Sequence, residues 1–240
     1  LCASRATWRS PPSPVAPDGV VEEESAPAQV AEALTFAQRQ AICQGDPRVQ
    51  AGVVSLDICI GADFFFRETF NGNGRTCASC HRVEQNFTID PGFIATLPNN
   101  DPLFVASQQP ALANLERPQQ LRDFSLILEN VDGTQPGGPN VRFTLRTTPH
   151  NLSMGVSVRS PGAPNPPAER TGWSGDGAPG QGRLADFTNG AIGQHFTRSL
   201  NRVAGTDFRV ATEQEGQAVA LYMRELGRKN EIDLNGIGFS

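Results

Sequence analysis

The chain has 240 residues, of which 25 are Asp or Glu and 20 are Lys or Arg, so its formal net charge is −5. A broad nucleic-acid-binding surface is normally basic, and this mildly acidic balance argues against one. The sequence has no run of about 18 apolar residues, so we expect no transmembrane span. The 24 glycines and 19 prolines predict long loops around a modest helical core.

The first residues differ in composition from the rest of the chain. Residues 1–28 are rich in Pro, Ser and acidic residues, which predicts an extended or disordered tether. We expect residues 29–240 to form a single domain. Cys2 lies in the stretch LCAS, which resembles the end of a lipoprotein cleavage site. Cys2 is therefore a candidate for lipid attachment, although Leu1 precedes it and no apolar signal core is present.

Helical spacing is clearest near the two ends of the expected domain. Residues 29–44 predict a helix that stops at Gly45. The stretch TEQEGQAVALYMRELG predicts a helix that starts with a capping box formed by Thr212 and Glu215 and ends at Gly227. The apolar face is expected to contain Leu34, Ala37, Ala41 and Ile42 in the first helix, and Val219, Tyr222, Met223 and Leu226 in the last.

Three further segments between these ends are compatible with helix. They are residues 61–70, residues 121–133 and residues 183–196. Residues 159–182 contain too much Pro and Gly for either periodicity and predict a loop. The fold class that we expect is mostly α with long Gly/Pro-rich loops.

The stretch RTCASCH contains the most specific motif in the chain. Cys77, Cys80 and His81 form C-x-x-C-H, the signature of covalent haem c attachment. The two thiols would form thioether bonds with the porphyrin, and His81 would be the proximal iron ligand. A structural zinc site would need four ligands, and the sequence has neither a second C-x-x-C nor an H-x3-5-H motif. A thioredoxin-like dithiol would need a βαβ context, which the Phe-rich run before the motif does not offer.

Two of the remaining cysteines predict a disulfide. Cys43 and Cys59 lie in mainly apolar surroundings on either side of a short segment. A bond between them would contribute about 3 kcal/mol by closing a loop of this length. The alternative is a pair of buried free thiols. We favour the disulfide because haem attachment to this motif takes place outside the bacterial cytoplasm, where disulfides persist.

Several motifs together resemble the bacterial di-haem cytochrome c peroxidase family. The stretch GADFFFRETFNGNGRTCASCH is similar to the helix and C-x-x-C-H of the family's first haem domain. RTTPHNLSMGV and GWSGDG resemble its R-x-x-P-x-L-x-N and W-D-G segments, and RLADFTNGAIGQHF the helix that follows. ALYMRELGR resembles the helix that closes each cytochrome c-like domain. The resemblance implies a cytochrome c-like haem domain for residues 29–240.

The chain also departs from this family. The family's peroxidatic chemistry uses two haems, whereas this chain has one C-x-x-C-H, and Ser174 displaces the aspartate of W-D-G. We therefore expect a periplasmic or extracellular electron carrier that exchanges one electron at a time with a redox partner protein. The alternatives are a haem peroxidase, or the electron-donating half of a di-haem peroxidase, and a structural cytochrome subunit of a larger assembly.

The sixth iron ligand has several candidates. His195 ends the helix-like run at the place where the resemblance puts an axial Met, and we favour it. Met154 and His150 are weaker alternatives, together with an open site, while core packing sufficiently explains Met223.

Other side chains are candidates for haem contact. Trp173 corresponds to the family's W-D-G tryptophan, which resembles an electron relay; burial against the porphyrin is its alternative role. Arg75, Arg142 and Arg146 could pair with a haem propionate, because arginine binds carboxylates in bidentate fashion. Surface solvation is the alternative for each arginine.

Overall fold

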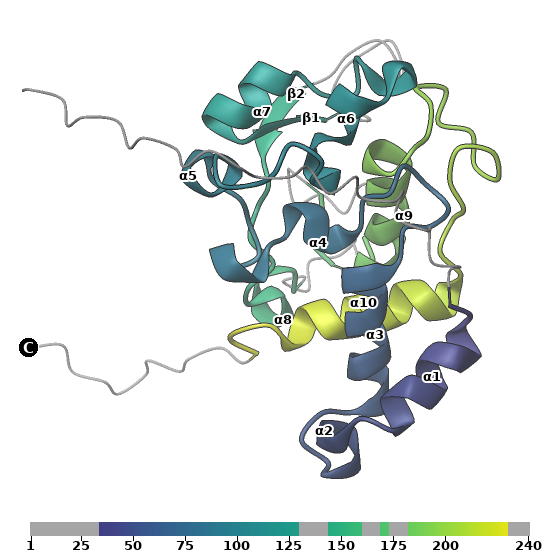
Figure 1. Cartoon of the computed structure of the whole chain (residues 1–240). Helices are drawn as coiled ribbons and strands as arrows, with labels where there is room; N and C mark the ends of the chain where they lie inside the picture. The colour runs from purple at the N-terminus through teal and green to yellow at the C-terminus, as the bar shows by residue number, and fades with distance from the viewer. Residues whose placement is uncertain (1–33, 130–143, 160–168, 173–181, 230–240) are drawn as a thin grey trace, which may run out of the picture. The chain divides into compact units, whose positions relative to one another are not determined.

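Helices make up most of the regular structure in the computed structural model, which describes residues 34–129, 144–159, 169–172 and 182–229 (Figure 1). This confirms the mostly α class. The elements, with η marking 3-10 helices, are α1 (Phe36–Gln44), α2 (Pro47–Gln50), α3 (Leu56–Arg67), α4 (Cys77–Cys80), η1 (Val83–Gln85), α5 (Pro91–Ile94), η2 (Pro102–Phe104), α6 (Val105–Gln108), η3 (Pro110–Leu112), α7 (Pro118–Phe124), β1 (Leu126–Glu129), β2 (Thr144–Thr147), α8 (Met154–Ser157), α9 (Leu184–His195) and α10 (Glu213–Glu225).

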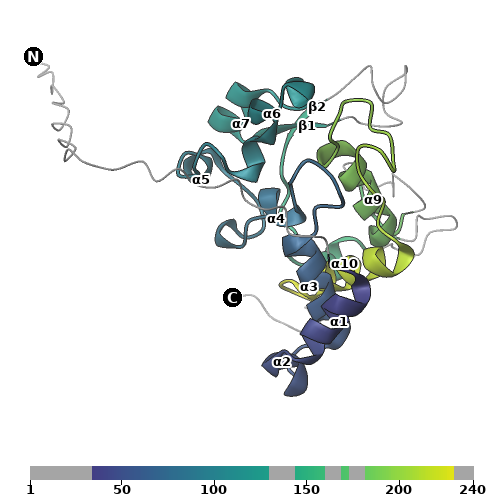
Figure 2. The ribbon, with the colours of Figure 1, turned by 45° about the vertical axis from the view of Figure 1, so that its right-hand side comes forward.

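The crossing of α3 and α10 is the principal helix contact (Figures 1 and 2). Gly61 on α3 makes the close approach possible, because a Cβ at this position would lie 1.9 Å from the backbone oxygen of Ala218 on α10. Around the crossing lies an apolar group that we call the α3–α10 cluster. Its large buried members are Ile60, Phe64, Phe65, Phe87, Leu184, Val219, Tyr222 and Met223.

The predicted ends of the last helix are confirmed. The Thr212 side chain accepts a hydrogen bond from the Glu215 N–H, and the Glu215 carboxylate accepts one from the Thr212 N–H, so both halves of the capping box form. Gly227 follows the helix with a φ of +73°, a conformation that glycine adopts without strain. Residues 184–195 of the segment predicted at 183–196 also form a helix, α9.

The helix predicted at residues 29–44 forms from Phe36 to Gln44, after its N-cap Thr35, so residues 34 and 35 are not helical, contrary to the prediction, and its predicted buried face is also wrong. Ala37 and Ala41 are exposed and Ile42 is 50 % exposed, whereas Arg39 and Cys43 are buried. The inward face is selected by the disulfide of Cys43 and by the ion pairs of Arg39 with Asp63 and Glu68. These partners are distant in sequence, so the apolar spacing within the helix did not reveal them.

The helix predicted at residues 121–133 is also wrong at residues 125–129, and residues 130–133 lie outside the described part of the chain. Ser125 takes a left-handed conformation with a φ of +52° and ends α7, and Leu126–Glu129 then form strand β1. β1 pairs antiparallel with β2, with Ile127 opposite Arg146. The apolar run LIL is thus extended because its hydrogen-bonding partner lies in a later part of the chain.

Some predicted regions lie outside the described residues. These are the tether at residues 1–28, Cys2 within it, and most of the loop predicted at residues 159–182. The described residues all belong to one compact unit, Ala33–Ser240. Within the described ranges, no helix is long and apolar enough to cross a membrane.

Candidate functional site

The C-x-x-C-H motif forms a single helical turn followed by a histidine. Cys77 and Cys80 begin and end α4, and the His81 N–H caps the turn by donating to the Cys77 carbonyl at 3.0 Å. Both thiols are outside any disulfide. Burial raises the pKa of Cys77 to about 12, and the nearby Cys80 adds to the shift, so Cys77 is a thiol at neutral pH. The two sulfurs and the imidazole therefore come from one short, locally ordered segment.

A backbone hydrogen bond fixes the tautomer of His81. Nδ1 lies 2.9 Å from the carbonyl oxygen of Phe87, and because a carbonyl can only accept, Nδ1 carries the proton. The lone pair is then on Nε2, the arrangement that a metal-binding imidazole needs. Burial lowers the pKa of His81 to about 4; the backbone carbonyls of Phe87 and Pro149 oppose this shift, and the charge of His195 adds to it. His81 is therefore neutral at pH 7.

The loop after the motif is shaped to present the Phe87 carbonyl. Asn86 and Phe87 both have left-handed backbones, with φ of 55° and 60°. Non-glycine residues adopt this region at a cost of order 1 kcal/mol or more each. The loop closes because the Phe87 N–H donates to the Arg82 carbonyl at 2.7 Å. The backbone strain at Asn86 and Phe87 thus lies where the Phe87 carbonyl fixes the orientation of the His81 imidazole.

The motif lies where three apolar groups meet. Cys77 packs against the α3–α10 cluster and also against a group around the end of α9. Cys80 packs against a group under α7 and β1. We call these groups the α9 cluster and the α7–β1 cluster. The α9 cluster contains Phe70, Ile192, Phe196, Phe208 and Ala211, and the α7–β1 cluster contains Ile89, Ile94, Leu103, Phe104, Leu121 and Ile127.

The structure brings His195 to the neighbourhood of the motif. His195 is the last residue of α9, and its charge acts on the pKa of His81, so the two imidazoles lie within electrostatic range. The segment before the motif is bonded to the same helix end, because the Asn73 side chain donates to the carbonyls of His195 and Thr197, each at 2.9 Å. Sequence reasoning missed Asn73, and its place in an ordinary turn sequence, NGNG, gave no signal for it.

The two weaker ligand candidates have different surroundings. His150 is exposed, and its Nδ1 accepts a hydrogen bond from the Leu152 N–H at 3.2 Å. Met154 is partly buried at the start of α8 and packs against the α3–α10 cluster. The side chain of Met223 lies in that same cluster, as its predicted packing role requires.

Arg75 is placed in a buried ion pair. Its Nη1 donates to Glu116 at 2.8 Å and its Nη2 to the Leu103 carbonyl at 2.7 Å, and its side chain is completely buried. The other Glu116 oxygen accepts from the Leu128 N–H at 2.9 Å. The guanidinium thus has acceptors within the protein. Through its bond to the Leu103 carbonyl, Arg75 connects the start of the C-x-x-C-H segment to the α7–β1 cluster.

Three further residues, Arg142, Arg146 and Trp173, are candidates for haem contact. Arg146 lies in β2 and is partly buried. Arg142 and Trp173 lie outside the described residues.

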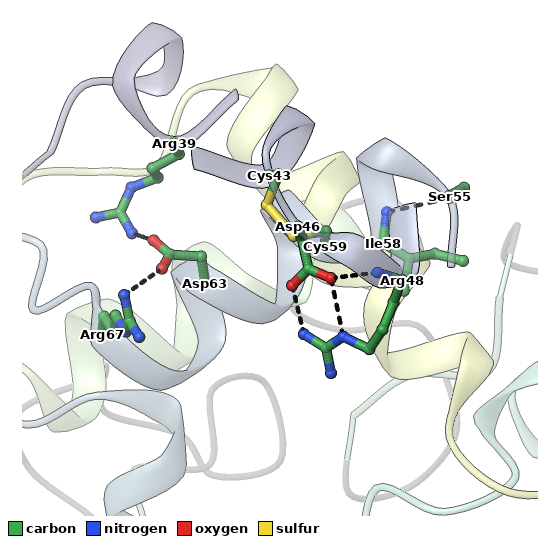
Figure 3. The surroundings of a disulfide bond; sticks show 9 residues. All are labelled: Arg39, Cys43, Asp46, Arg48, Ser55, Ile58, Cys59, Asp63 and Arg67. Carbon is green, nitrogen blue, oxygen red and sulfur yellow. Dashed lines mark hydrogen bonds and ion pairs between the residues drawn. A yellow bond between two sulfur atoms is a disulfide. The ribbon is translucent and has the colours of Figure 1, made fainter. Parts of the chain in front are cut away.

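The predicted disulfide is confirmed. Cys43 on α1 is bonded to Cys59 on α3, with a Cα–Cα distance of 5.8 Å (Figure 3). In the same region Asp63 pairs with Arg39 and with Arg67, and Asp46 accepts from Arg48 (Figure 3). The bond therefore fixes α1 to the helix that leads into the C-x-x-C-H motif.

Comparison with protein-family models, curated proteins and solved structures gave no match. The functional interpretation therefore depends on the chemistry of the residues themselves. Among the described residues, no three or more His, Cys, Asp or Glu side chains gather as a metal cluster would. A haem does not need such a cluster, because the porphyrin supplies four nitrogen ligands and the protein supplies one or two.

Proposed function

We propose that the chain is a c-type cytochrome with a cytochrome c-like haem domain, which transfers single electrons outside the cytoplasm. The observation that carries the proposal is the state of His81, whose Nδ1–H is bonded to the Phe87 carbonyl directly after a turn bearing Cys77 and Cys80. A histidine in this tautomer offers Nε2 to iron. Two thiols one turn apart and an adjacent, oriented imidazole form the donor set that haem c requires.

Each residue has a distinct task in this proposal. Cys77 and Cys80 would hold the haem through thioether bonds, each formed by adding S–H across a vinyl group, with the proton going to the terminal vinyl carbon. His81 would offer its Nε2 lone pair to the iron, and the Phe87 carbonyl orients the ring. When bound, haem supplies an iron centre that gains and loses one electron. The three apolar clusters around α4 contact the two cysteines and would provide apolar surface for the porphyrin.

We further propose His195 as the sixth ligand. Two observations favour it: it ends α9, whose Ile192 belongs to the α9 cluster that Cys77 packs against, and Asn73, four residues before Cys77, is bonded to the His195 carbonyl. Met154 remains the second candidate, and the exposed His150 the third. A histidine in place of methionine favours a lower potential, since a thioether ligand raises it.

Location and partners are proposed on the same basis. The disulfide between Cys43 and Cys59 is typical of an oxidising compartment, which supports the periplasm or the cell exterior. The partner that we propose is a redox protein, and Trp173 is a candidate for the electron path to it. Lipid attachment at Cys2 would place this exchange at a membrane surface.

The first experiment tests covalent haem. The chain is produced in the periplasm of a host that attaches haem c, and is then denatured and assayed for haem on a gel and by mass spectrometry. We expect one haem in the wild type and none bound covalently after the double substitution Cys77→Ala and Cys80→Ala. The matched control, Cys43→Ala with Cys59→Ala, also removes two cysteines and should keep its haem. A wild-type protein without covalent haem contradicts the proposal.

The second experiment separates an electron carrier from a peroxidase. The reduced holoprotein is mixed with hydrogen peroxide, and its reoxidation is compared with that by an external one-electron acceptor. A carrier with both axial positions filled exchanges electrons rapidly with the acceptor and turns over little peroxide. Enzymatic turnover of peroxide with an added electron donor would support the peroxidase alternative instead.

A further inference from the structure

Asn73 has every polar atom occupied. Its side-chain nitrogen donates to the carbonyls of His195 and Thr197, and its backbone N–H donates to the carbonyl between them, that of Phe196, at 2.8 Å. Its side-chain oxygen accepts from the Arg75 N–H at 3.1 Å, and its own carbonyl accepts from the Gln109 side chain at 3.5 Å. Because Asn73 is 7 % exposed, these bonds are shielded from water.

The three carbonyls that Asn73 binds belong to His195, the last residue of α9, and to Phe196 and Thr197 directly after it. The last carbonyls of a helix have no partner within the helix and need one from outside. Asn73 supplies it from a different part of the chain, so it caps α9 at His195. The close contact is supported by Gly72, where a Cβ would lie 2.1 Å from the Phe196 oxygen, and by the stacking of Phe70 near Phe196, with ring centroids 5.9 Å apart.

The chemistry of the cap requires an amide. One nitrogen with two hydrogens must face two carbonyl oxygens, while an oxygen faces a backbone N–H. Aspartate has the same shape but would direct a carboxylate oxygen toward both carbonyls in a buried place, which is repulsive. Serine would leave at least one of the carbonyls without its donor.

We propose that Asn73 is a positioning residue for axial ligation of the haem iron, an inference that depends on the proposed function and on His195 as the sixth ligand. Asn73 lies four residues before Cys77, so it fixes the end of α9 relative to the start of the haem motif. It thereby holds His195 at a set place relative to His81. Without this cap, the end of α9 loosens and His195 binds iron less tightly.

The test uses the holoprotein and reads the coordination state rather than activity. We compare wild type, Asn73→Asp, Asn73→Ser and His195→Ala by absorption and EPR of the oxidised protein, and by titration with imidazole. The wild type is expected to be low-spin, and His195→Ala high-spin. Losing the two bonds to the α9 carbonyls should weaken internal ligation about tenfold, so both Asn73 variants bind imidazole about tenfold more tightly and show a high-spin fraction.

Asn189→Asp is the matched control. Asn189 also joins α9 to a distant segment, donating to the Ala211 carbonyl at 3.2 Å and accepting from the Ala211 N–H at 2.7 Å. The same substitution there should lower the midpoint of unfolding but leave the spin state and imidazole affinity unchanged. Asn73→Ser, the milder change, keeps the test usable if Asn73→Asp does not fold.

The outcomes separate this inference from the proposed function. A wild type without covalent haem overturns both. If haem is attached, then an oxidised wild type that is high-spin, or a His195→Ala protein that stays low-spin, overturns the role of Asn73 and leaves the cytochrome proposal standing. Asn73 variants that are destabilised like Asn189→Asp, but have the wild-type spectrum, show a purely structural cap and also overturn it.

Discussion

Arg75 and Glu116 form a charge pair that is almost completely shielded from solvent, with side chains 0 % and 1 % exposed. Desolvation makes such a pair a modest net contributor, but removing one partner leaves the other charge buried and uncompensated. From the sequence, Arg75 was a candidate for a haem contact because it lies beside the motif. Its partner Glu116 could not be recognised from the sequence, because it is distant in the chain.

We expect Arg75→Ala to lower the free energy of unfolding by about 3 to 5 kcal/mol, because Glu116 keeps its charge in an apolar setting. Denaturant unfolding followed by circular dichroism measures this. The control is Arg48→Ala, since Arg48 pairs with Asp46 with its own side chain 71 % exposed and should change stability little. Equal losses in the two variants would contradict this account of burial.

For single residues, prediction from the sequence succeeded where the residues that act together are close in the chain. C-x-x-C-H placed Cys77, Cys80 and His81 on one turn, and the capping box at Thr212 was correct. It failed for Asn73, Phe87 and Glu116, whose roles depend on backbone atoms or side chains elsewhere in the chain. The sequence pattern of one segment contains no information about which atoms of another segment will contact it.

At the level of elements, the disulfide sets how α1 contacts α3. Reducing it, or substituting Cys43→Ala with Cys59→Ala, should lower the free energy of unfolding by about 3 kcal/mol because the unfolded chain regains loop entropy. Denaturant titration with and without reductant measures the loss. Reductant should have no further effect on the double variant, and a large additional effect would indicate another reducible bond.

The α3–α10 crossing depends on the absence of a side chain at Gly61. Gly61→Ala places a methyl group against the Ala218 backbone, so the helices must separate, and we expect a loss of about 3 kcal/mol or more. Gly193→Ala is the control, because this glycine is also inside a helix but its Cβ would meet only the Phe208 ring at 3.4 Å. Helix propensity then gives stabilisation of up to about 1 kcal/mol. Thermal unfolding compares the two, and an unchanged Gly61→Ala protein would exclude the close crossing.

Element prediction was reliable for α9 and α10, where helical spacing is clear, and in α10 a capping box agrees with that spacing. It failed for β1, because a strand's preference is decided by its pairing with β2 rather than by its own residues. It also chose the wrong face of α1, where a buried arginine and a disulfide outweigh apolar spacing.

For the molecule as a whole, the main consequence is that separate apolar clusters meet at α4. The α3–α10, α9 and α7–β1 clusters each contact a motif cysteine, so the haem that we propose would be shared among them. The mostly α class followed from composition and helical spacing, but this convergence depends on long-range contacts that spacing does not encode.

We expect the haem-free variant, Cys77→Ala with Cys80→Ala, to unfold at a lower midpoint and over a broader transition than the holoprotein. The unfolded chain would keep a covalent haem, but only the native state packs it against the clusters and binds its iron through the side chains, so losing the haem lowers stability and the clusters lose the group that couples them. Calorimetry and denaturant titration measure both effects. The His195→Ala holoprotein, which keeps its thioether bonds, should retain a sharp transition; an equally broad one would assign the coupling to His195 instead.

The bond between Cys43 and Cys59, 16 positions apart, turns that stretch of chain into a covalent ring. Within the ring, Ala51, Gly52 and Val53 are exposed, the kind of place where proteases cut. A cut there opens the ring but separates no fragment, because the sulfur bridge still joins both new ends. The nicked protein would migrate as one species until reduced and then as two, so a single proteolytic event in an oxidising environment would leave the part with the C-x-x-C-H motif attached to everything before it.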